Sequence, residues 1–192
     1  MMGTMINVSF IKFEIIKFEI ITLIFFKTYY RMIHIYKINE PTNKGKIAAF
    51  DYDWTLVRPN GKRKFPKDVD DWTWLYENIP EVLKRYEQDG YMIVIFTNQS
   101  KLWKLEQLQK ALSTLEIPLH IVVGYSPRGG DKADYKPNPQ MFYEVIKGDF
   151  DKESSFFVGD ALGRNKDFSD SDKVFAENIG ISWEAPETFF RK

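Results

Sequence analysis

The stretch "IAAFDYDWTLVRP", residues 47–59, joins a strand-like apolar run to two aspartates, Asp51 and Asp53. Burying one carboxylate costs free energy, and burying two close together costs more. Two aspartates at the end of an apolar strand therefore indicate a chemical role, and the residues around them show which role is possible.

Short apolar runs alternate with helical patterns from residue 46 onward. We expect strands at 46–50, 91–98, 119–124 and 155–160, and helices at 79–90, 102–115, 138–148 and 172–180. Apolar strands that alternate with helices are typical of a parallel sheet covered on both faces. The predicted fold class is α/β: an open, Rossmann-like, mainly parallel sheet with helices on both faces and a small flap after the first strand.

Polar side chains follow the predicted strands. They are Asp51 after the first strand, Thr97 and Asn98 at the end of the second, Lys136 in the loop after the third, and Asp160 after the fourth. Ligands of open α/β sheets bind beyond the carboxyl ends of the strands. We therefore expect these side chains to meet at one edge of the sheet.

This set of groups suits phosphoryl transfer. Asp51 and Asp160 offer the hard oxygen ligands that Mg²⁺ prefers, and neither histidine lies near another ligand type, so zinc and iron are not expected. A carboxylate can attack phosphorus when a metal and a lysine neutralise the transferring group, which makes Asp51 the candidate nucleophile and Lys136 its partner. Asp53 is the candidate acid and base.

Thr97 and Asn98 are expected to donate hydrogen bonds to the phosphoryl oxygens. Each of these residues also has an ordinary interpretation. A strand-end Asn suits turns, a loop lysine is usually solvated, and an aspartate after glycine commonly begins a turn. The occurrence of all of them in order favours the catalytic interpretation.

Four motifs, "DYDWT", "TN", "KP" and "GD", resemble those of haloacid-dehalogenase-type phosphatases. The segments "GKRKFPKDVDDWTWLYENIPEVL", "VIFTNQS" and "VGDALGRNKDFSDSDKVFAENIGISWEAPETFF" are similar to the phosphatase domain of polynucleotide kinase 3′-phosphatases, from about residue 46 to 190. The resemblance implies removal of a 3′-phosphate from DNA strand-break ends during repair, through an aspartyl phosphate, with RNA ends as an alternative. It also implies Mg²⁺ held among Asp51, Asp53, Asp160 and Asp167, together with a backbone carbonyl. By its sequence alone, Asp167 could equally cap the last helix.

The sequence departs from this family at two places near the site. Trp54 replaces the glycine that usually follows the second aspartate, and a bulky side chain there has to point away from the phosphate or narrow the entrance. The loop after "TNQ" is "SKLWK", so strand contacts there would pass to Lys101, Trp103 or Lys104. The chain also contains no GxxxxGK[ST] loop, so we expect no kinase activity.

Basic and aromatic residues near the site are candidates for contact with nucleic acid. Arg128 and Lys132 are expected to meet DNA phosphates. Aromatic residues between the first strand and the first helix could stack on bases, because basic residues lie among them. For Trp72 and Trp74 we favour packing onto the sheet instead.

Composition sets the class of protein. The 192 residues carry 27 Lys plus Arg, 27 Asp plus Glu and no Cys. Zero net charge argues against a general nucleic-acid coat, and the absence of cysteine is consistent with a reducing, nuclear or cytoplasmic location. We expect a monomer that is not embedded in a membrane.

Residues 1–40 lack the regular alternation of strand and helix patterns seen in residues 41–192, which we take as the phosphatase domain. "IKFEI" occurs twice in succession, at 11–15 and 16–20, and its charges interrupt any membrane span or signal peptide. The extension is expected to lie outside the functional domain, with Met32 as a candidate start.

Two other functions remain open at this point. One is a phosphatase of the same fold that acts on a small molecule such as a sugar phosphate or histidinol phosphate. The other is a module that binds DNA ends without turnover, with Trp54 blocking the chemistry.

Overall fold

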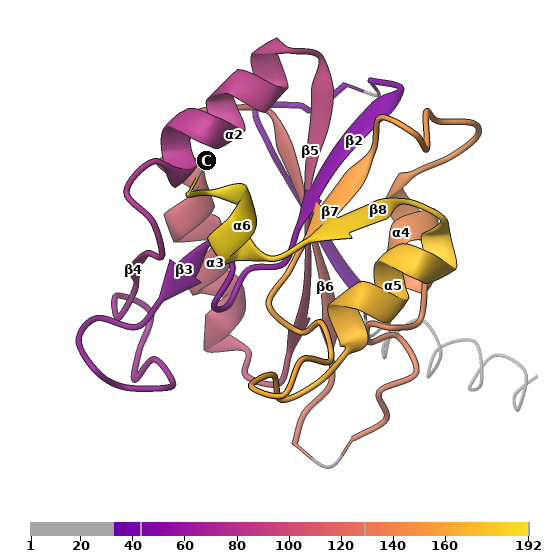
Figure 1. The fold of residues 1–192 in the computed structure, drawn as a ribbon. Coiled ribbons are helices and arrows are strands. Elements are labelled where there is room, and N and C mark those ends of the chain that lie inside the picture. The colour runs from indigo at the N-terminus through magenta and orange to yellow at the C-terminus, as the bar shows by residue number, and fades with distance from the viewer. Residues whose placement is uncertain (1–32, 43, 129, 192) are drawn as a thin grey trace, which may run out of the picture. The chain divides into compact units, whose positions relative to one another are not determined.

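The computed structural model describes residues 33–42, 44–128 and 130–191. Within them, a six-stranded sheet has the order β1-β6-β5-β2-β7-β8, and β3 pairs with β4 in a second, small sheet (Figure 1). The strands are β1 (Ile33–Ile38), β2 (Lys46–Phe50), β3 (Val57–Arg58), β4 (Thr73–Trp74), β5 (Tyr91–Gln99), β6 (Leu119–Tyr125), β7 (Phe156–Val158) and β8 (Ser182–Glu184). The helices are α2 (Ile79–Gln88), α3 (Trp103–Ser113), α4 (Gln140–Val145), α5 (Ser171–Ile179) and α6 (Pro186–Phe189). In the large sheet only the β1–β6 pair is antiparallel, which confirms the predicted mainly parallel α/β fold.

The central strand β2 is buried on both faces of the sheet. Ala48 and Phe50 pack with residues of α2 and α3, and Ile47 and Ala49 pack with residues of α4 and α5. Figure 1 shows α2, α3 and α6 on one side of the sheet and α4 and α5 on the other. Because both faces are covered, a continuous apolar run is what this position requires.

Helix ends follow local sequence signals. Pro80 lies in the first turn of α2, where its missing N–H removes no helical hydrogen bond. Gly180 ends α5 in the left-handed conformation, with φ 77°, which glycine adopts without a steric penalty. The helices predicted at 79–90 and 172–180 therefore end close to their glycines, whereas the helix predicted at 138–148 covers only Gln140–Val145.

Strand β1 differs from the expected N-terminal extension. Its residues pair antiparallel with β6, from Ile33 opposite Gly124 to Ile38 opposite Leu119. Part of the segment 1–40 therefore belongs to the sheet. Residues 1–32, including the candidate start at Met32, lie outside the described residues. In the described part of the chain, no helix combines the length and apolar character needed to cross a membrane.

Strands β3 and β4 form the predicted flap after β2. Asp71 anchors the loop between them, because its buried carboxylate accepts hydrogen bonds from the N–H groups of Asn60 at 3.1 Å and Lys67 at 2.8 Å. The ring centroids of Trp72 and Trp74 lie 5.4 Å apart in an edge-to-face arrangement, and both rings pack against the core. The structural interpretation of these two tryptophans is confirmed.

Candidate active site

Asp51 lies directly after β2, at the edge where the predicted side chains meet. Its N–H donates to the Val158 carbonyl of β7 at 2.9 Å, which fixes the residue between the neighbouring strands. Asp51 is only 7 % exposed, and Thr97, on the adjacent β5, is 1 % exposed. The site is therefore built into the end of the sheet rather than onto a surface loop.

Lys136 reaches the same edge from the loop after β6. Its Nζ lies 2.6 Å from a carboxylate oxygen of Asp51 and 2.7 Å from one of Asp172. Burial alone lowers the pKa of Lys136, but the charges of Asp172 and Asp51 outweigh burial and raise the pKa. Lys136 is therefore held as a buried cation beside Asp51.

Asn98 fixes the main chain of Lys136. Its Nδ2 donates to the Lys136 carbonyl at 3.1 Å, and its Oδ1 accepts the Lys136 N–H at 2.9 Å. Because the amide nitrogen carries two hydrogens, the predicted donation from Asn98 to the phosphoryl oxygens stays a prediction. The Oγ1 of Thr97 accepts a hydrogen bond from Gln99 at 2.8 Å, so the Thr97 hydroxyl proton is left as a donor.

Three carboxylates gather beside Lys136. One oxygen each of Asp51, Asp160 and Asp172 lies within 4.8 Å of the other two. Burial, with repulsion from the neighbouring carboxylates, raises the pKa of Asp51 to about 7 and that of Asp160 to about 8, although Lys136 opposes both shifts. When all three carboxylates are ionised, their negative charge therefore exceeds what the single ammonium group of Lys136 compensates.

Asp172 was not among the predicted metal ligands. It lies in the first turn of α5, and its carboxylate accepts the Ala161 N–H at 3.0 Å. That hydrogen bond and the ion pair with Lys136 turn a helix-start residue toward the sheet edge. In the sequence its only signal was an aspartate at the start of a helix, which is the ordinary place for a capping residue.

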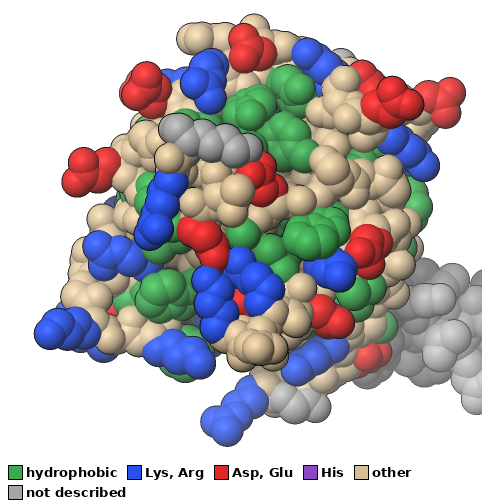
Figure 2. Space-filling view, in the orientation of Figure 1, with side chains coloured by type: hydrophobic (Ala, Val, Ile, Leu, Met, Phe, Trp, Pro, Cys, Tyr) green, Lys and Arg blue, Asp and Glu red, His purple; other side chains and the backbone are tan. Residues whose placement is uncertain are grey.

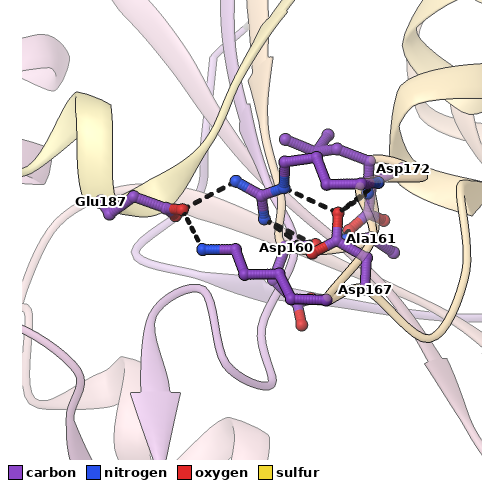
Figure 3. Close-up of polar contacts among 8 residues, drawn as sticks. Asp160, Ala161, Asp167, Asp172 and Glu187 are labelled. Carbon is purple, nitrogen blue, oxygen red and sulfur yellow. Dashed lines mark hydrogen bonds and ion pairs between the residues drawn. The ribbon is translucent and has the colours of Figure 1, made fainter.

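Asp167, a predicted metal ligand, lies outside the carboxylate cluster. Its carboxylate accepts two hydrogen bonds from the Arg164 guanidinium, at 2.7 and 3.0 Å, and further ones from the N–H groups of Leu162 and Arg164 (Figure 3). These hydrogen bonds, led by Arg164, lower the pKa of Asp167. Arg164 also donates to the Asp160 carbonyl at 3.2 Å and to Glu187 at 2.7 Å. Asp167 thus stabilises the loop that presents Asp160.

Asp53 also lies outside the cluster, and its carboxylate is held by two donors. One oxygen accepts from Gln99 Nε2 at 2.7 Å, and the other pairs with Lys104 Nζ at 2.6 Å. The Asp53 side chain remains 36 % exposed. A carboxyl group with fixed orientation and access to solvent is what a general acid and base requires.

Lys104 is buried, which corrects its predicted contact with a nucleic-acid strand. Its side chain is 6 % exposed, and Nζ also donates to Gln107 at 2.7 Å. Lys104 lies one helical turn before the buried Leu108, on the core-facing side of α3. Its ammonium group therefore pairs with Asp53 and is not presented on the surface.

The other predicted basic contacts are exposed. Arg128 and Lys132 lie on the loop after β6, and Lys101 lies just before α3. A groove of about 770 Å³ runs between the loop after β6 and the loop before α5, and Lys132, Lys136 and Phe168 are among its lining residues. The lining includes Lys136 but not Asp51, Asp160 or Asp172, so the groove borders the loop that carries the buried lysine.

Trp54 adopts a left-handed backbone, with φ 61°, a conformation that costs a residue with a Cβ on the order of 1 to 2 kcal/mol. Its indole Nε1 donates to the Lys64 carbonyl at 3.1 Å, which ties the side chain to the flap. The bulky residue is thus accommodated by contact with the flap.

Comparison with known proteins agrees with this geometry. The α/β fold and its edge of aspartates and lysine are consistent with a phosphatase, and the model of the polynucleotide kinase 3 phosphatase family matches residues 46–190. The chain belongs to this family. It is 38 % identical over 178 residues to the "Uncharacterized 20.8 kDa protein in FGF-VUBI intergenic region" of Autographa californica nuclear polyhedrosis virus, covering 83 % of this chain and 93 % of the viral protein.

Two further similarities concern a plant enzyme and a solved structure. The chain is 34 % identical over 169 residues to "Polynucleotide 3'-phosphatase ZDP" of Arabidopsis thaliana, covering 76 % of this chain but only 24 % of that protein. An uncharacterized protein from Listeria monocytogenes serotype 4b shares the fold, with a TM-score of 0.51, 19 % identity and coverage of 72 % of this chain and 77 % of the other.

Proposed function

We propose that the protein is a magnesium-dependent polynucleotide 3′-phosphatase that removes 3′-phosphates from DNA strand-break ends. The observation that carries the proposal is the buried Asp51 carboxylate, 2.6 Å from Lys136 Nζ and within 4.8 Å of two more carboxylates. The family match and the name of the plant relative support the choice of substrate. Action on DNA ends would place the protein in the nucleus or cytoplasm.

The proposed reaction has two steps on Asp51. A carboxylate oxygen attacks the phosphorus, the bond from phosphorus to the 3′ oxygen breaks, and that oxygen takes a proton from Asp53. Water then attacks the aspartyl phosphate and gives its proton to Asp53, which releases inorganic phosphate and restores the Asp51 carboxylate. Lys136 neutralises charge on the transferring group, and the Thr97 hydroxyl donates to one of its oxygens.

The carboxylate cluster fits a magnesium ion. Asp51, Asp160 and Asp172 supply hard oxygen donors, and burial, followed by repulsion between the carboxylates, raises the pKa values of Asp51 and Asp160, which a bound cation would offset. Asp51 and Asp160 would hold the ion, with Asp172 beside them. The ion would supply charge neutralisation on the phosphoryl oxygens.

We expect magnesium to stabilise the fold in a pH-dependent way. The folded-state pKa values of Asp51 and Asp160, about 7 and about 8, exceed the ordinary value of 3.8. Their contribution to metal-free stability is therefore greatest at low pH and is lost as pH rises through 7 to 8. Because Mg²⁺ competes with these protons, the rise in melting temperature on adding Mg²⁺ should be small near pH 6 and grow toward about pH 9. Thermal melts at each pH, with Mg²⁺ or with EDTA, measure this rise in melting temperature.

The same melts on Asp160→Asn provide the control for this prediction. That variant lacks one proposed oxygen ligand and one of the two titrating groups, so its response to Mg²⁺ should be weaker at every pH. A response of the parent protein that is equal near pH 6 and pH 9 would contradict the role assigned to the cluster.

Phosphate release from oligonucleotides tests the proposed function. With Mg²⁺, a DNA oligonucleotide carrying a 3′-phosphate should lose it, whereas a 5′-phosphate should remain and EDTA should stop the reaction. An RNA oligonucleotide measures sugar preference, and a 5′-hydroxyl oligonucleotide with ATP should stay unphosphorylated. Release from a sugar phosphate but not from the oligonucleotides would instead indicate a small-molecule phosphatase, and binding without release would indicate an end-binding module.

A further inference from the structure

Trp54 combines a strained backbone with an exposed aromatic side chain beside the candidate acid and base. It directly follows Asp53, has φ 61°, and is held by a hydrogen bond from its N–H to the Val57 carbonyl at 2.8 Å. Strained residues persist where the surrounding structure supports them, and they concentrate at functional positions. Fold stability alone does not account for a tryptophan here, because glycine would adopt this backbone freely.

The exposed surface of the Trp54 side chain is apolar. The residue is 37 % exposed, and its single polar group, Nε1, is already bonded to the Lys64 carbonyl. The indole is therefore fixed at one edge by the flap and has aromatic carbon in contact with solvent. A rigid, half-exposed ring of this kind is suited to stacking.

The flap supplies a second exposed ring and positive charge. Phe65 is 68 % exposed, and Lys64 Nζ lies 5.7 Å from its ring centroid. Residues 60–67 carry Lys62, Arg63, Lys64 and Lys67 and no acidic side chain. In Figure 2, Lys and Arg side chains gather along the lower left and bottom of the molecule, the region of the flap and the strand-end loops in Figure 1.

We propose that Trp54 and Phe65 form a stacking platform for unpaired bases that precede the 3′-phosphate, with Lys62 and Lys64 along the strand's phosphates. The occupant is a single-stranded polynucleotide, because exposed aromatic rings interleaved with cations match stacked bases and a polyanionic backbone. Bases paired in a duplex do not offer their faces to such rings. This inference rests on the proposed function and adds to it a preference for single-stranded 3′ ends.

Binding to the inactive full-length chain tests the platform. Fluorescence anisotropy with Mg²⁺ would follow a 5′-labelled, single-stranded DNA octamer with a 3′-phosphate, in an Asp51→Asn background. Trp54→Gly and Phe65→Ser should each raise Kd by about tenfold, in the range seen when a stacking ring is removed. Trp54→Phe keeps a ring but loses the Nε1 hydrogen bond, and should raise Kd less than about threefold. Tyr143→Ser removes an exposed aromatic on α4 and should leave Kd unchanged.

The outcomes separate stacking from support of the flap. Equal losses for Trp54→Gly and Trp54→Phe would overturn stacking, because they would assign the effect to the hydrogen bond with Lys64. Unchanged Kd for Trp54→Gly and Phe65→Ser, or equal binding of single strand and blunt duplex, would also overturn it. Trp54→Gly is suited to this test, since glycine tolerates φ 61° and the variant is expected to fold.

Turnover by the wild-type chain distinguishes failure of the platform from failure of the proposed function. If 3′-phosphate is released but the platform variants bind like their parent, only the platform is wrong. If the platform variants lose binding while no 3′-phosphate is released from any oligonucleotide, the platform stands as a strand-binding site and the phosphatase proposal is wrong.

Discussion

Asp51→Asn should abolish phosphate release from a 3′-phosphorylated oligonucleotide, with a loss in kcat of at least about 10³-fold. The amide occupies the same volume but is not a nucleophile, so the covalent step on this residue cannot occur. Steady-state phosphate release with Mg²⁺ measures the loss. Asp149→Asn, an exposed carboxylate outside the site, is the matched control and should retain wild-type turnover.

The same substitution should stabilise the metal-free protein. Because the pKa of Asp51 in the fold is about 7, its ionised form is disfavoured there, and its contribution to stability falls as pH rises from about 4 through 7. Asp51→Asn removes that charge, while Lys136 keeps Asp172 as a partner at 2.7 Å. Its melting temperature in EDTA should therefore exceed that of wild type at about pH 8 and approach it near pH 5.

A lower melting temperature for Asp51→Asn at about pH 8 would show that the ion pair with Lys136 outweighs the cost of burying the Asp51 charge. Retained turnover would contradict the proposed mechanism, because it would exclude Asp51 as the nucleophile. The two measurements therefore test the chemistry and the electrostatics of one residue independently.

Most of the sheet could be predicted because its strands are apolar throughout and separated by helical patterns. The missed elements lack that contrast. Strand β1, "IHIYKI", follows a segment rich in aromatic and charged residues, and its alternating burial is typical of an edge strand rather than a central one. Strand β8 and helix α6 have 3 and 4 residues, too few for a period to show.

The site was predictable where a residue lies at the end of a strand, as Asp51 does directly after β2 and Asp160 does two residues after β7. Side chains on helices and loops were harder to assign, because their direction depends on tertiary contacts, and Lys136 is an exception among them. Asp172 pairs with Lys136 at the sheet edge, whereas Asp167 pairs with Arg164. Lys104 was predicted to be an exposed basic residue, but the helical register of α3 buries it next to Asp53.

Lys136→Met should destabilise the fold strongly and abolish turnover. The ammonium group is the cation that faces Asp51 and Asp172, and removing one partner of a buried ion pair costs about 3 to 5 kcal/mol. For a domain of this size, the melting temperature should fall by roughly 6 to 20 °C. Thermal melts in EDTA measure the change, and phosphate release measures the loss of activity.

The loss in stability should depend on pH and on Asp172. At low pH the carboxylates left without Lys136 take up protons, so the destabilisation should be smaller near pH 5 than near pH 8. Adding Asp172→Asn to Lys136→Met should restore part of the stability, because it removes a buried charge that has lost its partner. Lys173→Met, which removes an exposed partner of Glu177 at 3.9 Å, should change stability by less than about 1 kcal/mol. Equal effects of Lys136→Met and Lys173→Met would mean that the buried lysine does not hold the carboxylate cluster together.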